Sequence, residues 1–104
     1  MDAGLVDRVL AVVELIPPGR TASYGTVGMV AGCGPRLVGR ILSRHGDGVA
    51  WWRVTSAAGE FPPNLLARAV PHWDAEGIAL AASGRGCARV QRMDAGALRA
   101  LDRS

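Results

Sequence analysis

Apolar side chains recur every three or four positions from Leu5 to Ile16, which predicts an amphipathic helix with one buried face. Asp2 is placed to cap the start of this helix. Pro17–Pro18–Gly19 then ends it, because proline cannot continue a helix and glycine favours a turn. The chain therefore opens with one helix that packs against the rest of the protein.

Two further helices follow, separated by a short glycine-containing turn. Ser23 is the expected N-cap of a helix over Tyr24–Val30, and Gly32–Cys33–Gly34 ends that helix. Pro35 suits the first turn of the next helix, which we expect over Pro35–Arg44. This order is typical of a helix-turn-helix unit, whose second helix enters a groove of DNA.

The rest of the chain predicts shorter elements. We expect an extended segment over Val49–Thr55, a helix over Leu65–Trp73 that Pro71 kinks or ends, short strands at Ile78–Leu80 and Ala88–Val90, and a last helix over Ala95–Leu101. The predicted fold class is mainly α, a winged-helix-like helix-turn-helix DNA-binding domain with short strands.

Composition narrows the class of protein. A chain of 104 residues with 49% hydrophobic residues predicts one folded domain over 1–104 rather than a disordered chain. No apolar run approaches the roughly 20 residues that a membrane span needs, and Met1–Gly4 lacks the basic region of a secretory signal. Cys33 and Cys87 have no zinc-site spacing. We expect a cytoplasmic monomer without metal or cofactor.

The type of basic residue is more informative than the net charge of +3. All twelve basic residues are arginines, whose planar guanidinium suits phosphates and bases. Arg36, Arg40 and Arg44 lie four apart and share one face of the predicted third helix. An arginine stripe is also the ordinary composition of a solvated helix face, so this spacing alone leaves both interpretations open.

Three blocks of residues carry a family resemblance. Arg20–Gly25, Arg36–Gly39 and Trp51–Val54 resemble the C-terminal domain of O6-alkylguanine-DNA alkyltransferases. Where that family reads Pro-Cys-His-Arg-Val, this chain has Ala50 and the tryptophan pair. Tryptophan at the cysteine position is the mark of alkyltransferase-like proteins. The resemblance implies binding to alkylated DNA without repair, and hand-over of the lesion to nucleotide excision repair proteins.

The resemblance also implies which residues contact DNA. Arg36 is expected to fill the gap left in the base stack when a nucleotide is flipped, and Tyr24 to crowd the adjacent phosphate. Gly39 is expected to let the helix approach the minor groove closely, since a side chain would hold the backbones apart. Ser23 and Arg40 complete the expected contacts with double-stranded DNA that contains O6-alkylguanine.

The pocket for the flipped base is expected to involve Trp51, Trp52 and Arg53. An indole N–H only donates a hydrogen bond and cannot accept an alkyl group as a thiolate does, so we expect no enzymatic activity. In an extended segment the two indoles would face opposite sides. We assign Trp51 to the pocket and Trp52 to a structural role or to a pocket wall from behind. Arg53 is expected to tie this segment to the helices.

Several alternatives stay open on the sequence. Tyr24 suits a core position as well as a DNA contact, and Glu76, without the histidine that its counterpart orients, suits a solvated helix end. The whole chain is also compatible with a winged-helix regulator that lacks lesion specificity, or with a protein-interaction module. Localisation is expected in the cytoplasm, on the bacterial nucleoid when DNA is bound.

Overall fold

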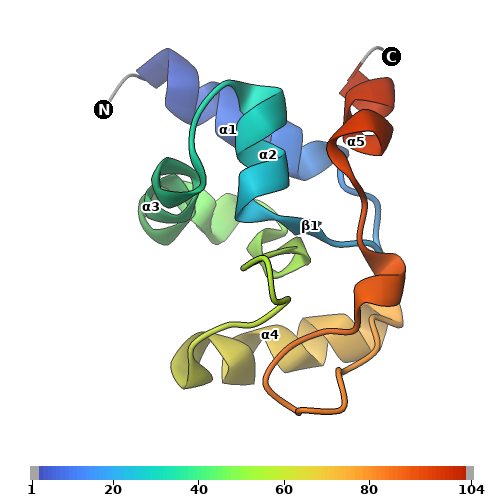
Figure 1. Ribbon diagram of the computed structural model, residues 1–104. Coiled ribbons are helices and arrows are strands. Elements are labelled where there is room, and N and C mark those ends of the chain that lie inside the picture. Colours follow the sequence, from blue (N-terminus) through green and yellow to red (C-terminus); the bar gives the residue numbers. More distant parts are fainter. Residues whose placement is uncertain (1–2, 103–104) are drawn as a thin grey trace.

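The computed structural model describes residues 3–102, most of which lie in helices. Helices α1, α2, α3 and α5 gather at one end of the molecule, α4 lies across the other end, and a two-stranded sheet lies between them (Figure 1). The mainly helical class with a helix-turn-helix unit is confirmed. The elements are α1 (Ala3–Leu15), β1 (Ala22–Ser23), α2 (Tyr24–Ala31), α3 (Pro35–His45), β2 (Val54–Thr55), α4 (Pro63–Glu76) and α5 (Ala95–Asp102).

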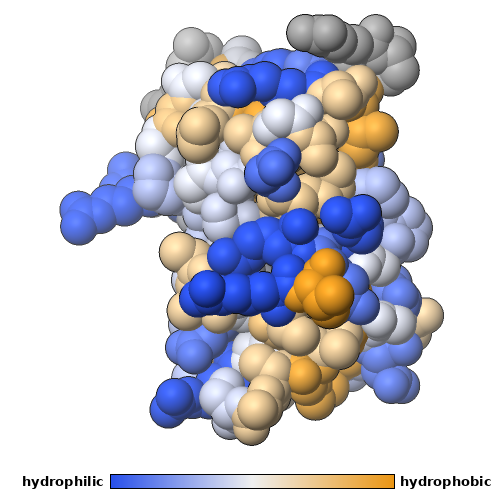
Figure 2. Space-filling model, turned by 45° about the vertical axis from the view of Figure 1, so that its right-hand side comes forward, coloured by the Kyte–Doolittle hydropathy of each residue, from blue (hydrophilic) through white to orange (hydrophobic). Residues whose placement is uncertain are grey.

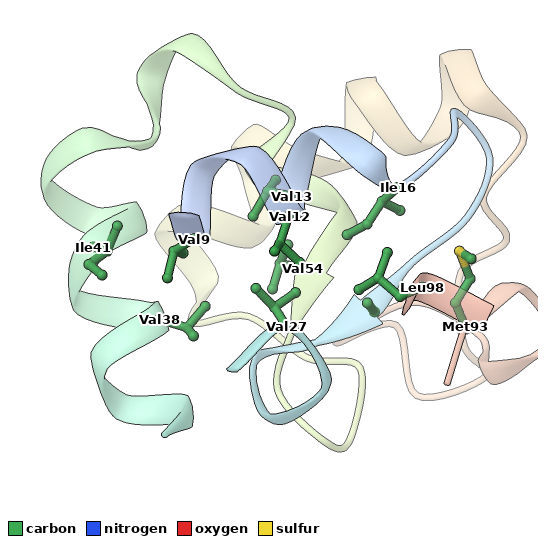
Figure 3. Close-up of a cluster of buried hydrophobic side chains, with 11 residues drawn as sticks. Val9, Val12, Val13, Ile16, Val27, Val38, Ile41, Val54, Met93 and Leu98 are labelled. Carbon is green, nitrogen blue, oxygen red and sulfur yellow. The ribbon is translucent and has the colours of Figure 1, made fainter. Parts of the chain in front are cut away.

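The main hydrophobic core lies where α1, α2, α3 and α5 meet (Figure 3). α1 contributes Val9, Val12 and Val13, which are fully buried, so the predicted apolar face is confirmed. Each such burial stabilises the fold by roughly 1.5–3 kcal/mol. The predicted cap, Asp2, lies outside the described residues. The other buried members of this core are Ile16, Ala22, Val27, Val38, Ile41, Val54, Met93 and Leu98.

A tight turn joins α2 to α3. Ser23 caps α2 as predicted, because its Oγ accepts the Thr26 N–H at 3.0 Å. The helix ends at Gly32 with φ +95°, a left-handed conformation that glycine adopts without steric cost. A Cβ on Gly28 would overlap the carbonyl oxygen of Cys33. The missing side chain at Gly28 therefore allows the turn to fold back onto α2.

The prediction of one extended segment over Val49–Thr55 is wrong before Val54. The backbone makes a 3-10 turn at Trp51–Arg53 and becomes extended only in β2. This turn lets both indoles meet the same face of α4, whereas a pleated strand would send them to opposite faces. β2 then pairs in parallel with β1, with Ala22 opposite Val54.

Helix α4 is longer than predicted. It begins earlier, at Pro63, and continues past Pro71 to Glu76, so the predicted end at Trp73 is wrong. Pro71 removes one N–H from the helix, but tertiary contacts hold the turn beyond it. Trp73 is buried and its Nε1 donates to the Trp52 carbonyl oxygen at 2.7 Å. Trp73 also belongs to a second core cluster with Phe61, Ala69, Ile78 and Cys87.

The strands predicted at Ile78–Leu80 and Ala88–Val90 are wrong. In the first segment Leu80 forms only an isolated bridge, with Cys87, and in the second Arg89–Gln91 forms a 3-10 turn. The Gln91 side chain replaces a strand ladder, because its Oε1 accepts the Ala79 N–H at 3.2 Å and its Nε2 donates to a neighbouring carbonyl. The last helix is confirmed. No helix within residues 3–102 has the length and apolar character to cross a bilayer.

Gly28→Ala is expected to lower the free energy of unfolding by at least about 2 kcal/mol, because the added methyl meets backbone rather than a movable side chain. Gly39→Ala is the matched control, since nothing lies within 4 Å of its added Cβ. That change is expected to stabilise α3 by roughly 0.5–1 kcal/mol. Urea unfolding of both variants measures the difference, and equal values would contradict the packing role of Gly28.

Candidate nucleic-acid interface

Helix α3 presents a stripe of arginines to solvent. Arg36, Arg40 and Arg44 are exposed, and none of them pairs with a carboxylate within the described chain. The opposite side of the helix packs into the core through Val38 and Ile41. The stripe is therefore held on a rigid helix with its donors available to an anionic ligand such as phosphate.

Gly39 lies within α3 where the helix borders a cavity. A Cβ at this position would point into open space, with nothing within 4 Å. Glycine in mid-helix costs roughly 0.5–1 kcal/mol relative to alanine, and packing among the described residues gives no reason for that cost. The missing side chain instead opens this part of α3 to a close approach from outside.

A cavity of about 190 Å³ brings together Tyr24, Gly39 and Trp51, three predicted site residues from separate parts of the sequence. Tyr24 begins α2, and burial raises the pKa of its phenol, so the hydroxyl keeps its proton at neutral pH. The other lining residues are Leu42, Ser43, Asp47, Phe61, Leu65 and Arg68. The lining thus combines aromatic and aliphatic side chains with a few polar and charged ones.

Three other predicted DNA contacts do not line this cavity. Arg36 and Arg40 extend from the exposed face of α3, beside it. Ser23 is occupied within the fold, because its Oγ accepts the Thr26 N–H and donates to the Thr26 hydroxyl at 3.1 Å. Its position at the start of α2 is therefore explained by helix capping alone.

Trp51 lines two cavities. Its ring packs edge-on against Phe61 at 5.7 Å between centroids, and the Arg68 guanidinium lies 5.2 Å from its ring centroid. The indole also borders a second, larger cavity of about 750 Å³, which Trp52 and Arg53 line as well. Of the three predicted pocket residues, Trp51 lines both cavities, whereas Trp52 and Arg53 line only the second one; Asp47 and Arg68 also line both. Trp52 does not line the first cavity.

Arg53, which follows the two tryptophans, ties the turn Trp51–Arg53 to two helices, as expected. Arg53 donates through Nη1 to the Ile16 carbonyl oxygen at the end of α1, at 2.9 Å. Its Nε and Nη2 also donate to the two carboxylate oxygens of Glu76 at the end of α4, at 2.9 and 2.6 Å. The bidentate geometry fixes the 3-10 turn between these helices.

Glu76 is not a solvated acid, and that alternative is wrong. Its side chain is 13% exposed, and it accepts from Trp52 Nε1 at 2.9 Å and from the Gly19 N–H at 3.0 Å, besides Arg53. Burial opposes ionisation and by itself raises the pKa of Glu76. The hydrogen bonds from Arg53, Gly19 and Trp52 outweigh burial, so its pKa lies below the ordinary value. We call these residues the Glu76 network.

The sequence reasoning missed one side of the site, on α4. His72 stacks on Trp52 with ring centroids 3.7 Å apart and an interplanar angle of 8°. Arg68, His72 and Glu76 are four residues apart and share one face of this helix. That spacing was readable in the sequence. Nothing in it showed that this face meets the tryptophan pair.

Neither cysteine takes part in the site. Cys87 is buried in the second core cluster, and Cys33 lies in the turn between α2 and α3. Burial raises the pKa of both thiols, which disfavours the reactive thiolate. No cluster of potential metal ligands occurs among residues 3–102.

Comparison with known proteins agrees with this geometry. The profile of the family described as "6-O-methylguanine DNA methyltransferase, DNA binding domain" matches residues 5–78. Among solved structures, the chain is similar to S. pombe Atl1 in complex with damaged DNA containing O6-carboxymethylguanine. The two chains are 23% identical, with a TM-score of 0.68 over 76% of this chain and 81% of Atl1. A sequence comparison with curated proteins finds no match.

Glu76→Gln is expected to lower the free energy of unfolding by about 2–3 kcal/mol at neutral pH, because Arg53 loses its charged partner. The folded-state pKa of Glu76 is depressed, so its stabilisation is complete above the unfolded value of about 4.3 and is lost as pH falls through the folded pKa. The gap between wild type and variant should therefore narrow in acid.

The control is Glu14→Gln, which removes the same charge from an exposed residue of α1 and should stay within about 0.5 kcal/mol of wild type. Chemical denaturation at several pH values measures both variants. If the difference in free energy of unfolding between wild type and Glu76→Gln did not change with pH, the charge of Glu76 would not be what stabilises the network.

Proposed function

The chain belongs to the family of 6-O-methylguanine DNA methyltransferase DNA-binding domains and has the fold of an alkyltransferase-like protein, and from this premise we propose that it recognises O6-alkylguanine in duplex DNA without repairing it. The observation that carries the proposal is the cavity shared by Tyr24, Gly39 and Trp51, directly beside the arginine stripe of α3. A surface that binds phosphates and an adjacent aromatic space together suit a flipped base.

The proposed recognition begins with α3 in the minor groove. Gly39 admits the sugar–phosphate backbone close to the helix, because no Cβ stands in the way. Flipping a nucleotide out of the stack costs a few kcal/mol. Arg36 pairs with no carboxylate among residues 3–102, so its guanidinium can enter the vacated position and bond the orphaned base. Tyr24 crowds the phosphate beside the flipped nucleotide.

The flipped base then lies against Trp51. The indole, together with Phe61, offers aromatic surface to the base and its alkyl group. The larger space behind Trp51 would receive substituents that extend beyond the first cavity. Arg53 and Glu76 do not contact the base in this proposal; they position Trp51 by holding the 3-10 turn that contains it.

Transfer of the alkyl group is not part of this function. Transfer would form a bond between a thiolate sulfur and the alkyl carbon while the bond from that carbon to O6 breaks and the guanine takes up a proton, so it needs a thiolate at the pocket. Trp51 holds that place, and neither Cys33 nor Cys87 lines either cavity. The protein is therefore proposed to bind the lesion as a cytoplasmic monomer and to signal its position to nucleotide excision repair proteins.

The size of the first cavity favours a second candidate function. At about 190 Å³ it is smaller than most small-molecule sites, which span roughly 300–1,000 Å³. A winged-helix DNA-binding regulator would use the same α3 surface without admitting a base. Such a protein would bind modified and unmodified duplexes alike, with strong salt dependence.

A comparison of binding to modified and unmodified DNA separates these two candidate functions. Fluorescence polarisation with two duplexes that differ by one O6-methylguanine is expected to show tighter binding to the modified one at moderate salt. Arg36→Ala should weaken lesion binding by about 1–3 kcal/mol. Arg89→Ala removes an equal charge from an exposed turn and should have little effect. Equal affinity of wild type for both duplexes would favour the regulator.

A further prediction concerns methyl transfer to a cysteine introduced at position 51. Trp51→Cys alone is expected not to transfer a methyl group at a useful rate, because a free thiol has a pKa of roughly 8.5 and needs a neighbour that stabilises the thiolate. Trp52 supplies no base, and its indole N–H is bonded to Glu76. Trp51→Cys with Trp52→His should gain transfer over the single change, since the imidazole would lie beside that carboxylate.

Mass spectrometry after incubation with an O6-methylguanine oligonucleotide measures this, as one added methyl group per chain. Trp52→His alone is the matched control and should remain unmodified. Stoichiometric methylation of the single Trp51→Cys variant within minutes would show that thiol activation here does not need the histidine.

A further inference from the structure

Three residues that line the first cavity are spaced four apart along the chain. They are Gly39 and Ser43 of α3, and Asp47 in the 3-10 turn Gly46–Gly48 that directly follows this helix. Residues four apart share one side of a helix, and the arginine stripe occupies the neighbouring positions. Along the cavity, the gap left by Gly39 is therefore followed by a hydroxyl and then by a carboxylate.

The aromatic part of the same lining comes from other elements. Tyr24 begins α2, and Trp51 packs edge-on against Phe61 with 5.7 Å between ring centroids. On the face of the molecule shown in Figure 2, hydrophilic and hydrophobic side chains are intermixed. In the cavity, by contrast, the hydroxyl of Ser43 and the carboxylate of Asp47 stand on one side. A planar base that stacks on the aromatic surface can turn one edge toward them.

Both polar side chains are available to a ligand. Ser43 and Asp47 are exposed, and within residues 3–102 neither side chain forms a hydrogen bond or an ion pair. Arg68 is the one basic residue in the lining of this cavity. Its guanidinium lies over the Trp51 ring, 5.2 Å from the centroid, and forms no ion pair with Asp47. The Asp47 carboxylate therefore keeps its full capacity to accept hydrogen bonds.

A carboxylate at this place needs a short-range partner to favour binding. At longer range Asp47 repels the phosphates that the adjacent arginine stripe attracts, so its charge alone opposes DNA binding. A carboxylate only accepts hydrogen bonds, whereas a serine hydroxyl also donates. Asp47 and Ser43 together therefore suit a ligand edge on which an N–H group lies beside a ring nitrogen that accepts.

O6-alkylguanine has such an edge. Alkylation at O6 leaves N1 without its hydrogen, so N1 accepts, and the 2-amino group is the one donor left beside it. We propose that the Asp47 carboxylate accepts a hydrogen bond from the 2-amino group of the flipped base, and that the Ser43 hydroxyl donates to N1. This inference rests on the proposed function and names its substrate class, which is O6-alkylated purines that carry a 2-amino group.

The test removes the 2-amino group from the DNA and the carboxylate from the protein, separately and together. Fluorescence polarisation compares three duplexes that differ at one position opposite cytosine: guanine, O6-methylguanine, and O6-methylhypoxanthine, which lacks only the 2-amino group. The deciding quantity is the ratio of the affinities for the two methylated duplexes. Ease of flipping differs between these duplexes but is the same for every protein variant, so it cancels when the ratios of two variants are compared.

Asp47→Ala is expected to lower this ratio about tenfold in favour of O6-methylhypoxanthine, the scale of losing one hydrogen bond to a charged group. Its binding to the unmodified duplex should not weaken, because a repulsive charge is lost. Asp74→Ala is the matched control, since it removes the same charge from an exposed position of α4 outside both cavities. That variant should keep the wild-type ratio. Ser43→Ala should weaken binding to both methylated duplexes by a similar factor, since each has N1.

The outcomes separate this inference from the function on which it rests. If wild type prefers O6-methylguanine to guanine and Asp47→Ala keeps the wild-type ratio, the role of Asp47 is overturned and lesion recognition stands. Equal affinity of wild type for all three duplexes would contradict the proposed function, and this inference with it. An equal fall of the ratio in Asp74→Ala would show an effect of net charge and overturn the proposal. Loss of binding to every duplex in Asp47→Ala would give Asp47 a structural role instead.

Discussion

The position of the tryptophan pair depends on one carboxylate. Glu76 accepts hydrogen bonds from the loop after α1, from the Trp52 indole and from Arg53, and Arg53 continues the network to the end of α1. A buried ion pair gains stability only when its lone pairs and donors are satisfied, and here they are. Three separate parts of the chain meet at this group, so the place of Trp51 beside the cavity follows from it.

The parts of the fold that the sequence predicted well are those governed by local physics. The apolar residues predicted to be buried on α1 and the arginines predicted to be exposed on α3 lie where expected, because each helix buries one face. The Ser23 cap could be predicted because capping involves neighbouring residues alone. The order of blocks, through the family resemblance, indicated that Tyr24, Gly39 and Trp51 belong together, which no periodicity could have shown.

The errors came from applying local rules where long-range contacts decide. Pro71 was expected to kink or end α4. The hydrogen bond from Trp73 Nε1 to the Trp52 carbonyl oxygen instead stabilises the helix beyond Pro71. With the helix extended, Arg68, His72 and Glu76 line one face and cover the tryptophan pair. The same contacts overturn the alternating strand predicted over Val49–Thr55. A 3-10 turn there gives each indole its own partner on α4.

The two-residue sheet has a consequence for how this site can diversify during evolution. β1 runs directly into α2, and β2 directly follows the turn that carries Trp51, so main-chain pairing links the helix-turn-helix unit to the pocket wall. Main-chain bonds do not depend on which side chains surround the cavity. Substitutions at Trp51 or Trp52 can therefore alter the shape and lining of the cavities, while the distance from the helix-turn-helix unit to this segment stays fixed by the main chain.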